Sequence, residues 1–259
     1  MADTTSRLSA RPPSDPLPPA LELRAVVKRY GKGLTEVRAL TDVSIAVQPG
    51  ELVAVMGPSG CGKSSLLHLA GALEDADAGQ VLVGGRDLSV LSATQRAALR
   101  RTDVGFVFQR LNLVPSLTAM ENVMLPLELE GVSARDARER ARAALVSVGI
   151  VEQLDRFPDD FSGGQQQRIA VARAVVGTRK LILADEPTGA LDTMTGDAVI
   201  ELMAALPATT GAAVVLVTHE PRYAAWADRV VFMRDGRIVD EASVAPSPLA
   251  SGAPAGVSR

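Results

Sequence analysis

The sequence lacks long apolar runs and has a single cysteine, Cys61. A lone cysteine excludes a disulfide framework within one chain and indicates a reducing compartment. The longest apolar runs, such as residues 212–217, are far shorter than the roughly 18 residues that suggest a membrane span. No apolar stretch typical of a secretory signal occurs near the N-terminus. We therefore expect a cytoplasmic protein whose membrane role comes through a partner.

A surplus of basic residues is also absent, since the net charge is −3. This balance argues against a general nucleic-acid binder, so no nucleic-acid partner is expected. Hydrophobic residues make up 47% of the 259, which is enough for a substantial core and suits one large domain or two small ones. Proline and small residues dominate residues 1–20 and 241–259, which predicts a disordered leader and a disordered tail. The folded domain is expected to span residues 21–240.

Residues 57–65 read Gly-Pro-Ser-Gly-Cys-Gly-Lys-Ser-Ser and fit the phosphate-binding pattern G-x-x-x-x-G-K-[ST]. A short apolar strand over 51–56 and a helix from 66 flank them, as this pattern requires. The glycines let the backbone bend around oxygen atoms, and the helix start presents N–H groups and a positive dipole. An ordinary glycine-rich turn is the alternative. The predicted phosphate-binding set is Gly57, Ser59, Gly60, Cys61, Gly62, Lys63, Ser64 and Ser65.

Alternating apolar residues over 21–25 and 37–47 predict a small antiparallel sheet, with Leu21, Leu23 and Ala25 as apolar positions. Tyr30 lies at the first turn of this sheet. It is expected to stack on an adenine ring, and the alternative is a half-buried tyrosine at a strand end. A further strand is expected over 80–83, and a capping box beginning at Ser92 predicts a helix to about residue 101.

Residues 104–108 read as a strand, and Gln109 lies just past its end, in a position suited to a metal or water contact. A glutamine in a loop is more often merely solvated, so alone it carries little weight. Periodicity over 133–148 predicts a helical insertion of about 110–160 in an otherwise α/β chain. Its charged run, 135–140, is expected to be a solvated helix face, with docking of a partner as the alternative.

A second helix start suited to an anion follows at residue 162. Ser162 is a good N-cap, and Gly163 and Gly164 leave backbone N–H groups open ahead of Gln165. A capped helix without a ligand is the alternative.

An apolar strand over 181–185 ends in two carboxylates, Asp185 and Glu186. Acids at the end of a buried strand are unfavourable unless they meet a cation or take part in chemistry. In a protein with a phosphate loop, Asp185 is the expected metal-side acid, and Glu186 is then placed to accept a proton from water. Another buried strand, 213–217, ends at His219, which is expected in the same strand-end crevice, where α/β proteins bind ligands.

The order of these motifs resembles the nucleotide-binding domain of ABC transporters over about residues 21–240. The matching stretches are the phosphate loop, the Q-loop glutamine Gln109, the signature motif 161–165, the Walker B run 181–186, the D-loop 190–192 and the switch histidine His219. The resemblance implies an α/β fold of the P-loop NTPase class, with a mixed or parallel core sheet, a small antiparallel β subdomain and a helical insertion subdomain. Cys61, Ser65 and Phe161 replace the commoner serine, threonine and leucine of the family, and none of these changes removes a catalytic group.

In this family two domains pack head to tail, with each ATP between the phosphate loop of one and the signature helix of the other. The resemblance therefore implies ATP and Mg²⁺ as ligands and a second copy of this chain as a partner. It assigns phosphate binding to Lys63, Mg²⁺ to Ser64, Gln109 and Asp185, activation of water to Glu186, and contact with the γ-phosphate to His219. It also assigns the partner's γ-phosphate to Ser162, Gly163, Gly164 and Gln165, the link between the two ATP sites to Asp192, and stacking of the base to Tyr30.

A narrower resemblance, carried by residues 106–109 and 111–123, is to the branch of lipoprotein release, macrolide export and antimicrobial-peptide resistance. It implies an ATPase subunit that energises an exporter or a membrane-extraction system. The integral membrane permease is then a separate chain, and this protein lies on the cytoplasmic face of the plasma (inner) membrane. The apolar segment 111–117 is a candidate for the groove that receives the permease, and simple core packing is the alternative.

Two other functions have to be weighed. The ATPase of a non-transport ABC complex that regulates an extracytoplasmic activity would carry the same motifs. A soluble DNA-repair or translation ATPase of this family is disfavoured, because the spacing from Lys63 to Ser162 leaves no room for a long coiled coil or zinc insertions. The transported substrate and the direction of transport stay open on the sequence alone.

Overall fold

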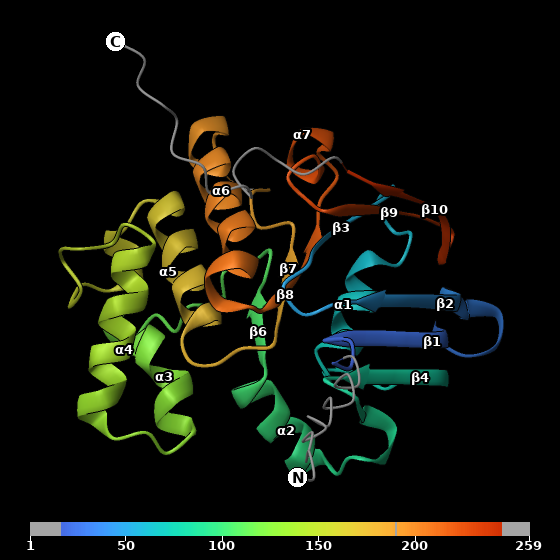
Figure 1. Ribbon diagram of the computed structural model, residues 1–259, viewed down its shortest axis with the longest axis horizontal. Helices are drawn as coiled ribbons and strands as arrows, with labels where there is room; N and C mark the ends of the chain where they lie inside the picture. The colour runs from blue at the N-terminus through green and yellow to red at the C-terminus, as the bar shows by residue number, and fades with distance from the viewer. Residues whose placement is uncertain (1–16, 190, 245–259) are drawn as a thin grey trace, which may run out of the picture.

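The computed structural model describes residues 17–189 and 191–244, which fold into two β-sheets and seven α-helices (Figure 1). The helices are α1 Lys63–Ala70, α2 Ala93–Thr102, α3 Ala119–Leu129, α4 Ala134–Ser147, α5 Gly163–Val175, α6 Thr193–Thr210 and α7 Pro221–Ala224. Within the described ranges, none of these helices combines the length and the apolar character needed to cross a membrane.

The core sheet has six strands in the order β10-β9-β3-β8-β7-β6. They are β3 Leu52–Met56, β6 Val104–Val107, β7 Leu181–Asp185, β8 Ala213–Val217, β9 Arg229–Arg234 and β10 Arg237–Ser243. Pairing is parallel from β9 to β6, and β10 is antiparallel to β9, so the sheet is mixed. Every residue of β8 is buried, because both faces of the sheet are covered. The predicted α/β fold is confirmed.

The second sheet is antiparallel, in the order β2-β1-β4-β5. Its strands are β1 Leu21–Tyr30, β2 Val37–Val47, β4 Ala78–Val83 and β5 Arg86–Asp87. The alternating pattern expected for β1 is wrong at Ala25, which is exposed and has a left-handed φ of 48°. A bulge in the pairing with β2 inserts a residue between Leu23 and Val26, so Val26 takes the buried position instead.

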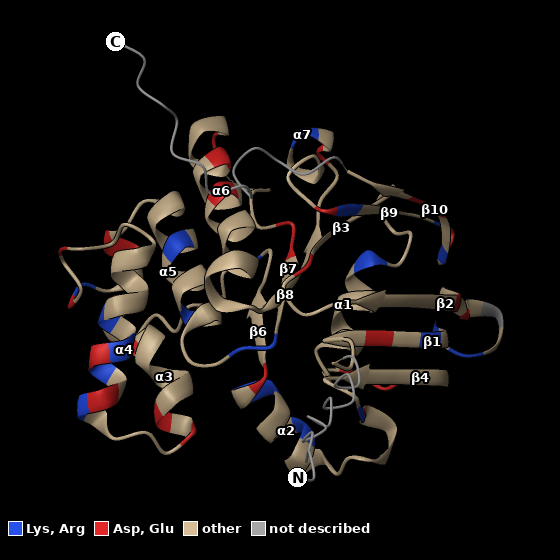
Figure 2. Ribbon diagram, in the orientation of Figure 1, with Lys and Arg blue, Asp and Glu red and all other residues tan. Residues whose placement is uncertain are grey.

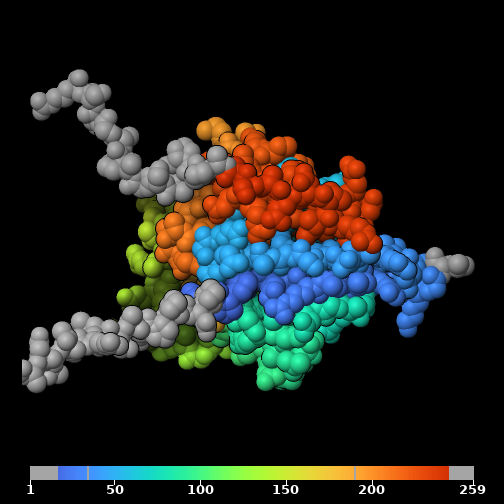
Figure 3. Space-filling view, turned by 45° about the vertical axis from the view of Figure 1, so that its right-hand side comes forward, coloured from blue at the N-terminus to red at the C-terminus, as the bar shows by residue number. Residues whose placement is uncertain are grey.

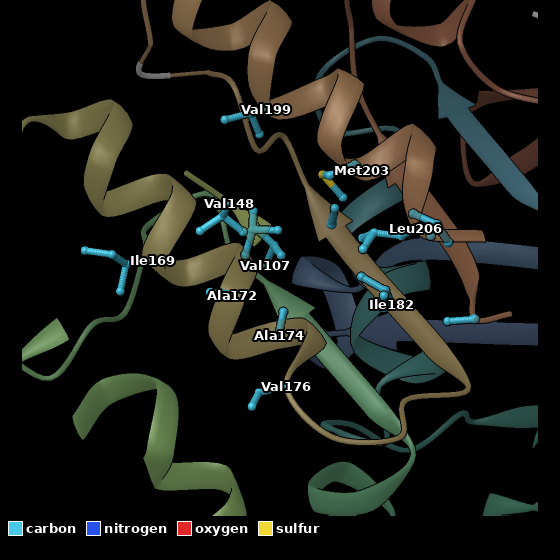
Figure 4. Packing of buried hydrophobic residues seen from close by; sticks show 14 of the residues in the cluster. Val107, Val148, Ile169, Ala172, Ala174, Val176, Ile182, Val199, Met203 and Leu206 are labelled. Carbon is cyan, nitrogen blue, oxygen red and sulfur yellow. The ribbon is translucent and has the colours of Figure 1, made fainter. Parts of the chain in front are cut away.

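Successive residues of the core strands face two different hydrophobic clusters. On β7, Ile182 and Ala184 belong to a cluster that they share with side chains of α3 to α6. Leu181 and Leu183 belong to a second cluster, with side chains of α1 and of the antiparallel sheet. Figure 4 shows part of the first cluster, in which side chains of α5 and α6 pack over β6 and β7. The core sheet is therefore the middle layer of the protein.

Helices α3, α4 and α5 pack against one another at the side away from the antiparallel sheet, on the left in Figure 1. Helices α3 and α5 both start with complete capping boxes, headed by Thr118 and Ser162. The charged run 135–140 lies on α4, and every residue of the run except Ala137 is exposed. Figure 2 shows both signs of charge along this helix. The run is thus a solvated helix face, and the helical region continues through α5.

Helix α6 continues past Pro207 and ends at Thr210. A proline usually stops a helix, because it lacks an N–H group and its ring crowds the preceding turn. Here Pro207 lies in the last turn, where the Thr210 hydroxyl donates to the Leu206 carbonyl at 2.8 Å. Gly211, with a φ of 73°, then ends the helix. The helix therefore continues for three residues past its proline.

The folded part extends beyond residues 21–240 at both ends. Ala20 is buried, and its N–H donates to the Val47 carbonyl at 2.9 Å. Strand β10 continues to Ser243 because residues 241–243 pair with β9, so the predicted tail begins too early. In Figure 3 these last strands lie against the band formed by β2. The rest of the predicted leader, 1–16, and of the tail, 245–259, lies outside the described residues.

Gly105 of β6 lies so close to α5 that a Cβ on it would overlap the carbonyl oxygen of Ala174. We expect Gly105→Ala to displace α5 and to lower the free energy of unfolding by about 1–3 kcal/mol. Urea unfolding followed by circular dichroism measures this change. Gly163→Ala is the matched control, because its new Cβ would meet no described atom within 4 Å. Equal stability of Gly105→Ala and wild-type protein would contradict the close approach.

Candidate functional site

The phosphate loop connects β3 to α1, and close neighbours explain two of its glycines. Gly62 has a φ of 105°, and a Cβ on it would overlap the Ala39 carbonyl oxygen of β2. A Cβ on Gly57 would overlap the Met233 carbonyl oxygen of β9. The loop therefore requires glycine at both positions. The first N–H groups of α1 have no acceptor within the helix, so they are available to a phosphate.

The side chain of Lys63 bonds the beginning of the phosphate loop. It is 7% exposed, and its ammonium donates to the carbonyls of Gly57 and Pro58 at 2.8 and 2.9 Å. A buried ammonium that meets two neutral carbonyls and the Cys61 sulfur, but no carboxylate among the described residues, is well suited to an anion. Cys61 is buried in the hydrophobic cluster below the loop, and its backbone N–H already donates to the Pro58 carbonyl at 3.4 Å. Ser59 is exposed on the loop.

Tyr30 lies beside α1, and its side chain is partly open to solvent. Its hydroxyl donates to Oε2 of Glu74 at 2.7 Å and lies 3.3 Å from the Ser65 hydroxyl. The same carboxylate meets Nδ1 of His68 at 3.1 Å. Glu74 therefore ties Tyr30 to the helix that follows the phosphate loop. Sequence reasoning missed Glu74, because a single acid in a turn belongs to no recognisable motif.

Three neighbouring strands end at one edge of the core sheet and bring predicted residues together there. Glu186 follows β7, Gln109 follows β6 and His219 follows β8. The Gln109 Nε2 atom donates to Oε2 of Glu186 at 3.3 Å, and the His219 Nδ1 atom lies 3.4 Å from Oε1 of Glu186. Glu186 has a left-handed φ of 44°, which is uncommon for a residue other than glycine and is typical of functional sites.

Asp185, the last residue of β7, has an unfavourable environment for its charge. Burial raises the pKa of this carboxyl, and the nearby charge of Glu186 raises it further. A hydrogen bond from Ser64 and the charges of His68 and Lys63 act in the opposite direction without cancelling the rise. A carboxylate in this position gains from a bound cation.

The donor set fits Mg²⁺ bound together with a nucleotide. Mg²⁺ in nucleotide sites is usually held by one or two carboxylates and by the phosphates of the ligand. In the part of the chain that the structure describes, no group of three or more His, Cys, Asp or Glu residues could hold a metal by itself. A Mg²⁺ ion would therefore depend on the phosphates as well as on Ser64, Gln109 and Asp185.

The second predicted anion site lies apart from the phosphate loop. Ser162 caps α5 in a capping box with Gln165, and both Ser162 and Gly163 are exposed. Over the described ranges, no hydrogen bond or ion pair joins residues 162–165 to the loop. The start of α5 is thus an open helix N-terminus that the loop of its own chain leaves free.

Gly164 and Asp192 are connected through Thr195 of α6. A Cβ on Gly164 would overlap the Thr195 methyl group. The N–H and the hydroxyl of Thr195 donate to the Asp192 carboxylate at 3.1 and 2.7 Å. Sequence reasoning missed Thr195, although its position three residues after Asp192 is the spacing of an N-cap. Ala190 of the predicted D-loop lies outside the described residues.

Residues 40–189, more than half of the chain, match the family model described as ABC transporter. The chain belongs to this family. The matched range contains the phosphate loop, Gln109, Ser162 and Glu186, so the family resemblance expected from the ordered motifs is confirmed.

Relatives in the ABC transporter family include proteins of two architectures. The macrolide export ATP-binding/permease protein MacB of Hyphomonas neptunium is 45% identical over 224 residues, which cover 86% of this chain and 35% of that protein. The lipoprotein-releasing system ATP-binding protein LolD 2 of Caulobacter vibrioides is 46% identical over 220 residues, which cover 85% of this chain and 96% of that protein. This chain thus spans about a third of MacB and nearly all of LolD 2.

Solved structures confirm the predicted ABC cassette fold. The ATP-binding cassette MJ0796, a dimer in a post-hydrolysis state bound to ADP and Pi, aligns with a TM-score of 0.81 and 37% identity, over 88% of this chain and 100% of that chain. The protein cbiO1 from Clostridium perfringens, part of the ABC transporter complex cbiONQ, aligns with a TM-score of 0.78 and 25% identity, over 87% of this chain and 89% of that chain.

Replacement of Asp185 by asparagine and replacement of Asp192 by asparagine are expected to change the stability of the nucleotide-free and metal-free protein in opposite directions. Because the pKa of Asp185 is raised, the folded state holds this proton more tightly than the unfolded state. Stability is then lost as the pH rises from the unfolded value of about 3.9 through the folded pKa. We expect Asp185→Asn to raise the melting temperature in EDTA, more at about pH 8 than at about pH 5.

Asp192→Asn is the matched control for this experiment. Hydrogen bonds from Thr195 lower the pKa of Asp192, so its charged form stabilises the fold, and this contribution is lost only as the pH falls through the folded pKa. Asp192→Asn is therefore expected to lower the melting temperature near neutral pH. Differential scanning fluorimetry across the pH range measures both variants. A lower melting temperature for Asp185→Asn as well would contradict the sign given for Asp185.

Proposed function

We propose that this chain is the ATP-binding and ATP-hydrolysing unit that energises an ABC transporter, through ATP-driven pairing of two copies. The arrangement around Glu186 carries this proposal. Gln109 and His219, which follow the strands on either side of β7, contact its two carboxylate oxygens. Beside it, Ser64 of the phosphate loop bonds Asp185. A carboxylate oriented in this way next to a phosphate loop suits the transfer of a phosphoryl group to water.

Hydrolysis of ATP requires a base at the attacking water and positive charge around the γ-phosphate. Glu186 is the base, and the bond from Gln109 to Oε2 sets the orientation in which its carboxylate takes the proton of the water. Lys63 and the first N–H groups of α1 hold the phosphates. His219 is placed beside Glu186, where its imidazole contacts the γ-phosphate.

Mg²⁺ belongs to the proposed ligand set, and its charge neutralises the β- and γ-phosphates when it is bound. Ser64, Gln109 and Asp185 are the residues proposed to hold it. The raised pKa of Asp185 supports this assignment, because a carboxylate in an unfavourable environment gains most from a cation. Tyr30 is proposed to stack on the adenine, and its partial exposure beside α1 supports this role.

Two copies of the chain are proposed to share each ATP. Ser162, Gly163, Gly164 and Gln165 form an open helix start that their own phosphate loop leaves free, and such a start favours an anion. In a two-fold dimer it meets the γ-phosphate held by the other copy, and Asp192 lies at the same interface. The dimeric MJ0796 structure supports this arrangement. ATP would then join the two copies, and hydrolysis would release them.

The partner is proposed to be an integral membrane permease, with this chain as a separate subunit on the cytoplasmic face of the plasma membrane. The names of LolD 2, an ATP-binding protein of a lipoprotein-releasing system, and of MacB, a macrolide export protein, support a membrane partner and release or export. The proposed docking region is the half-buried segment 111–117 after Gln109. It adjoins a cavity of about 240 Å³ that Phe108, Asn112 and Arg173 line.

Regulation of an extracytoplasmic activity without transport is the alternative output. It would use the same ATP chemistry and the same residues. Reconstitution of the chain with its membrane partner in sealed vesicles separates the two outputs. ATP-dependent movement of a substrate across or out of the bilayer supports transport.

Glu186→Gln is expected to bind ATP normally and to hydrolyse it about 10²–10⁴-fold more slowly, since it removes the base and keeps the shape. The variant should accumulate as an ATP-bound dimer. Phosphate release measures turnover, and size-exclusion chromatography in ATP measures pairing. Glu201→Gln, on the exposed face of α6, is the control and should behave like wild type. Full turnover of Glu186→Gln, with only monomer in ATP, would remove Glu186 from this role.

Shared sites predict rescue when two inactive variants are mixed. Lys63→Ala disables the phosphate loop, and Ser162→Arg blocks the open helix start, so each variant alone is expected to be inactive. A mixed dimer has one site built from the intact loop of one copy and the intact helix of the other. An equal mixture should therefore recover about a quarter of wild-type ATPase activity. A mixture no more active than the separate variants would contradict sites shared between copies.

A further inference from the structure

Arg173, in the last turn of α5, holds the loop that follows Gln109. Its Nη1 atom donates to the Asn112 carbonyl at 2.6 Å, and its Nη2 atom donates to the Leu111 carbonyl at 2.8 Å. The planar guanidinium thus binds two consecutive backbone carbonyls with its two ends. Asn112 has a left-handed φ of 49°, which bends the chain at this contact.

The environment of the Arg173 guanidinium is unfavourable for its charge, which indicates that this side chain does more than fill space. Burial lowers the pKa of Arg173, and no carboxylate among the described residues counteracts the effect. Arg179, which is buried and lies nearby, differs because it donates to the Glu130 carboxylate at 2.9 Å. A charged group that is partly buried without an opposite charge is unfavourable, so the two carbonyl bonds of Arg173 have to offset this cost.

The loop between β6 and α3 is also anchored further along. Asn122 of α3 is fully buried, its amide donates to the carbonyls of Val114, Leu117 and Thr118, and its oxygen accepts the Val114 N–H at 2.8 Å. The segment 111–118 is therefore bonded to the helical part of the molecule. Gln109 lies two residues before this anchored segment, and its side chain donates to Glu186.

We propose that Arg173 is a positioning residue that fastens the Gln109 loop to α5 and so holds the Gln109 amide at the Glu186 carboxylate. This inference rests on the role given to Gln109 under the proposed function. The helix that carries Arg173 begins at Ser162, where the ATP of the other copy is proposed to bind. Helix α5 has 13 residues and is therefore about 20 Å long. A shift of α5 toward that ATP therefore moves the Gln109 loop of the same chain.

The first test asks whether Arg173 fastens the loop, whatever the activity. Arg110 is exposed between Gln109 and Leu111, so it offers a trypsin site within the fastened segment. We expect Arg173→Leu to be cleaved after Arg110 faster than wild type, and Arg173→Lys, which keeps one donor group, to be intermediate. Arg179→Leu is the matched control, because it also removes a buried arginine but leaves both carbonyl bonds to the loop. Cleavage of Arg173→Leu and Arg173→Lys at the wild-type rate would overturn the fastening.

The second test asks whether Arg173 acts through Gln109. Gln109→Ala and Arg173→Leu are each expected to slow ATP hydrolysis by between about 10- and 100-fold, the effect of a misplaced catalytic group. The double variant is expected to be no slower than Gln109→Ala, since the loop has no amide left to place. Mg²⁺-free affinity for a fluorescent ATP analogue should stay at the wild-type value in all three. Multiplied losses in the double variant would overturn the inference.

The two tests separate failure of this inference from failure of the proposed function. Wild-type turnover by Gln109→Ala would refute the proposed role of Gln109, and with it the action of Arg173 through Gln109. Slow turnover by Gln109→Ala, with normal turnover by Arg173→Leu, would refute only the role of Arg173. If Arg173→Leu fails to fold, Arg173→Lys takes its place in both tests, and a normal Arg110 cleavage rate with normal turnover in that variant overturns the inference.

Discussion

Parallel pairing of β6, β7 and β8 places the groups of the strand-end site. Ala184 pairs with both Val107 and Leu216, and Asp185 pairs with Val217, so the residues that follow all three strands emerge at one edge. Alternate residues of these strands pack into two different hydrophobic clusters, and a slip by one residue would exchange them between the clusters. The contacts of Glu186 with groups after β6 and β8 are a direct result of this register.

The antiparallel sheet has a second role beyond its own core. The carbonyl of Ala39 on β2 closes on Gly62, and the carbonyl of Met233 on β9 closes on Gly57. The two sheets are also joined where the Thr41 N–H donates to the Gly236 carbonyl at 2.8 Å. The phosphate loop is thus held between them, and the contact of β2 with the last strands is visible in Figure 3. Its shape depends on how these sheets pack.

The helical part is joined to the rest of the molecule by specific contacts near the site. Arg173 bonds the loop after Gln109, and Gly164 packs on Thr195, which in turn bonds Asp192. These contacts connect the outward-facing start of α5 with Asp192 and with the loop that follows Gln109. Movement of α5 relative to the core sheet would consequently act on both ends of this connection.

The sequence by itself determined the elements that depend on near neighbours. The glycine loop, the capping box at Ser92, the N-cap at Ser162 and the apolar strands formed as expected, because their interactions span only a few residues. Ala25 and the strand end at 243 were misjudged, since a bulge and an edge pairing depend on a partner strand. The motifs indicated the candidate residues one by one. Only the tertiary structure showed that Gln109 and His219 contact Glu186, and that Arg173 bonds the loop after Gln109. Hydrogen bonds between distant residues leave no periodic pattern in the chain, and so they become visible only once the fold has brought the partners together.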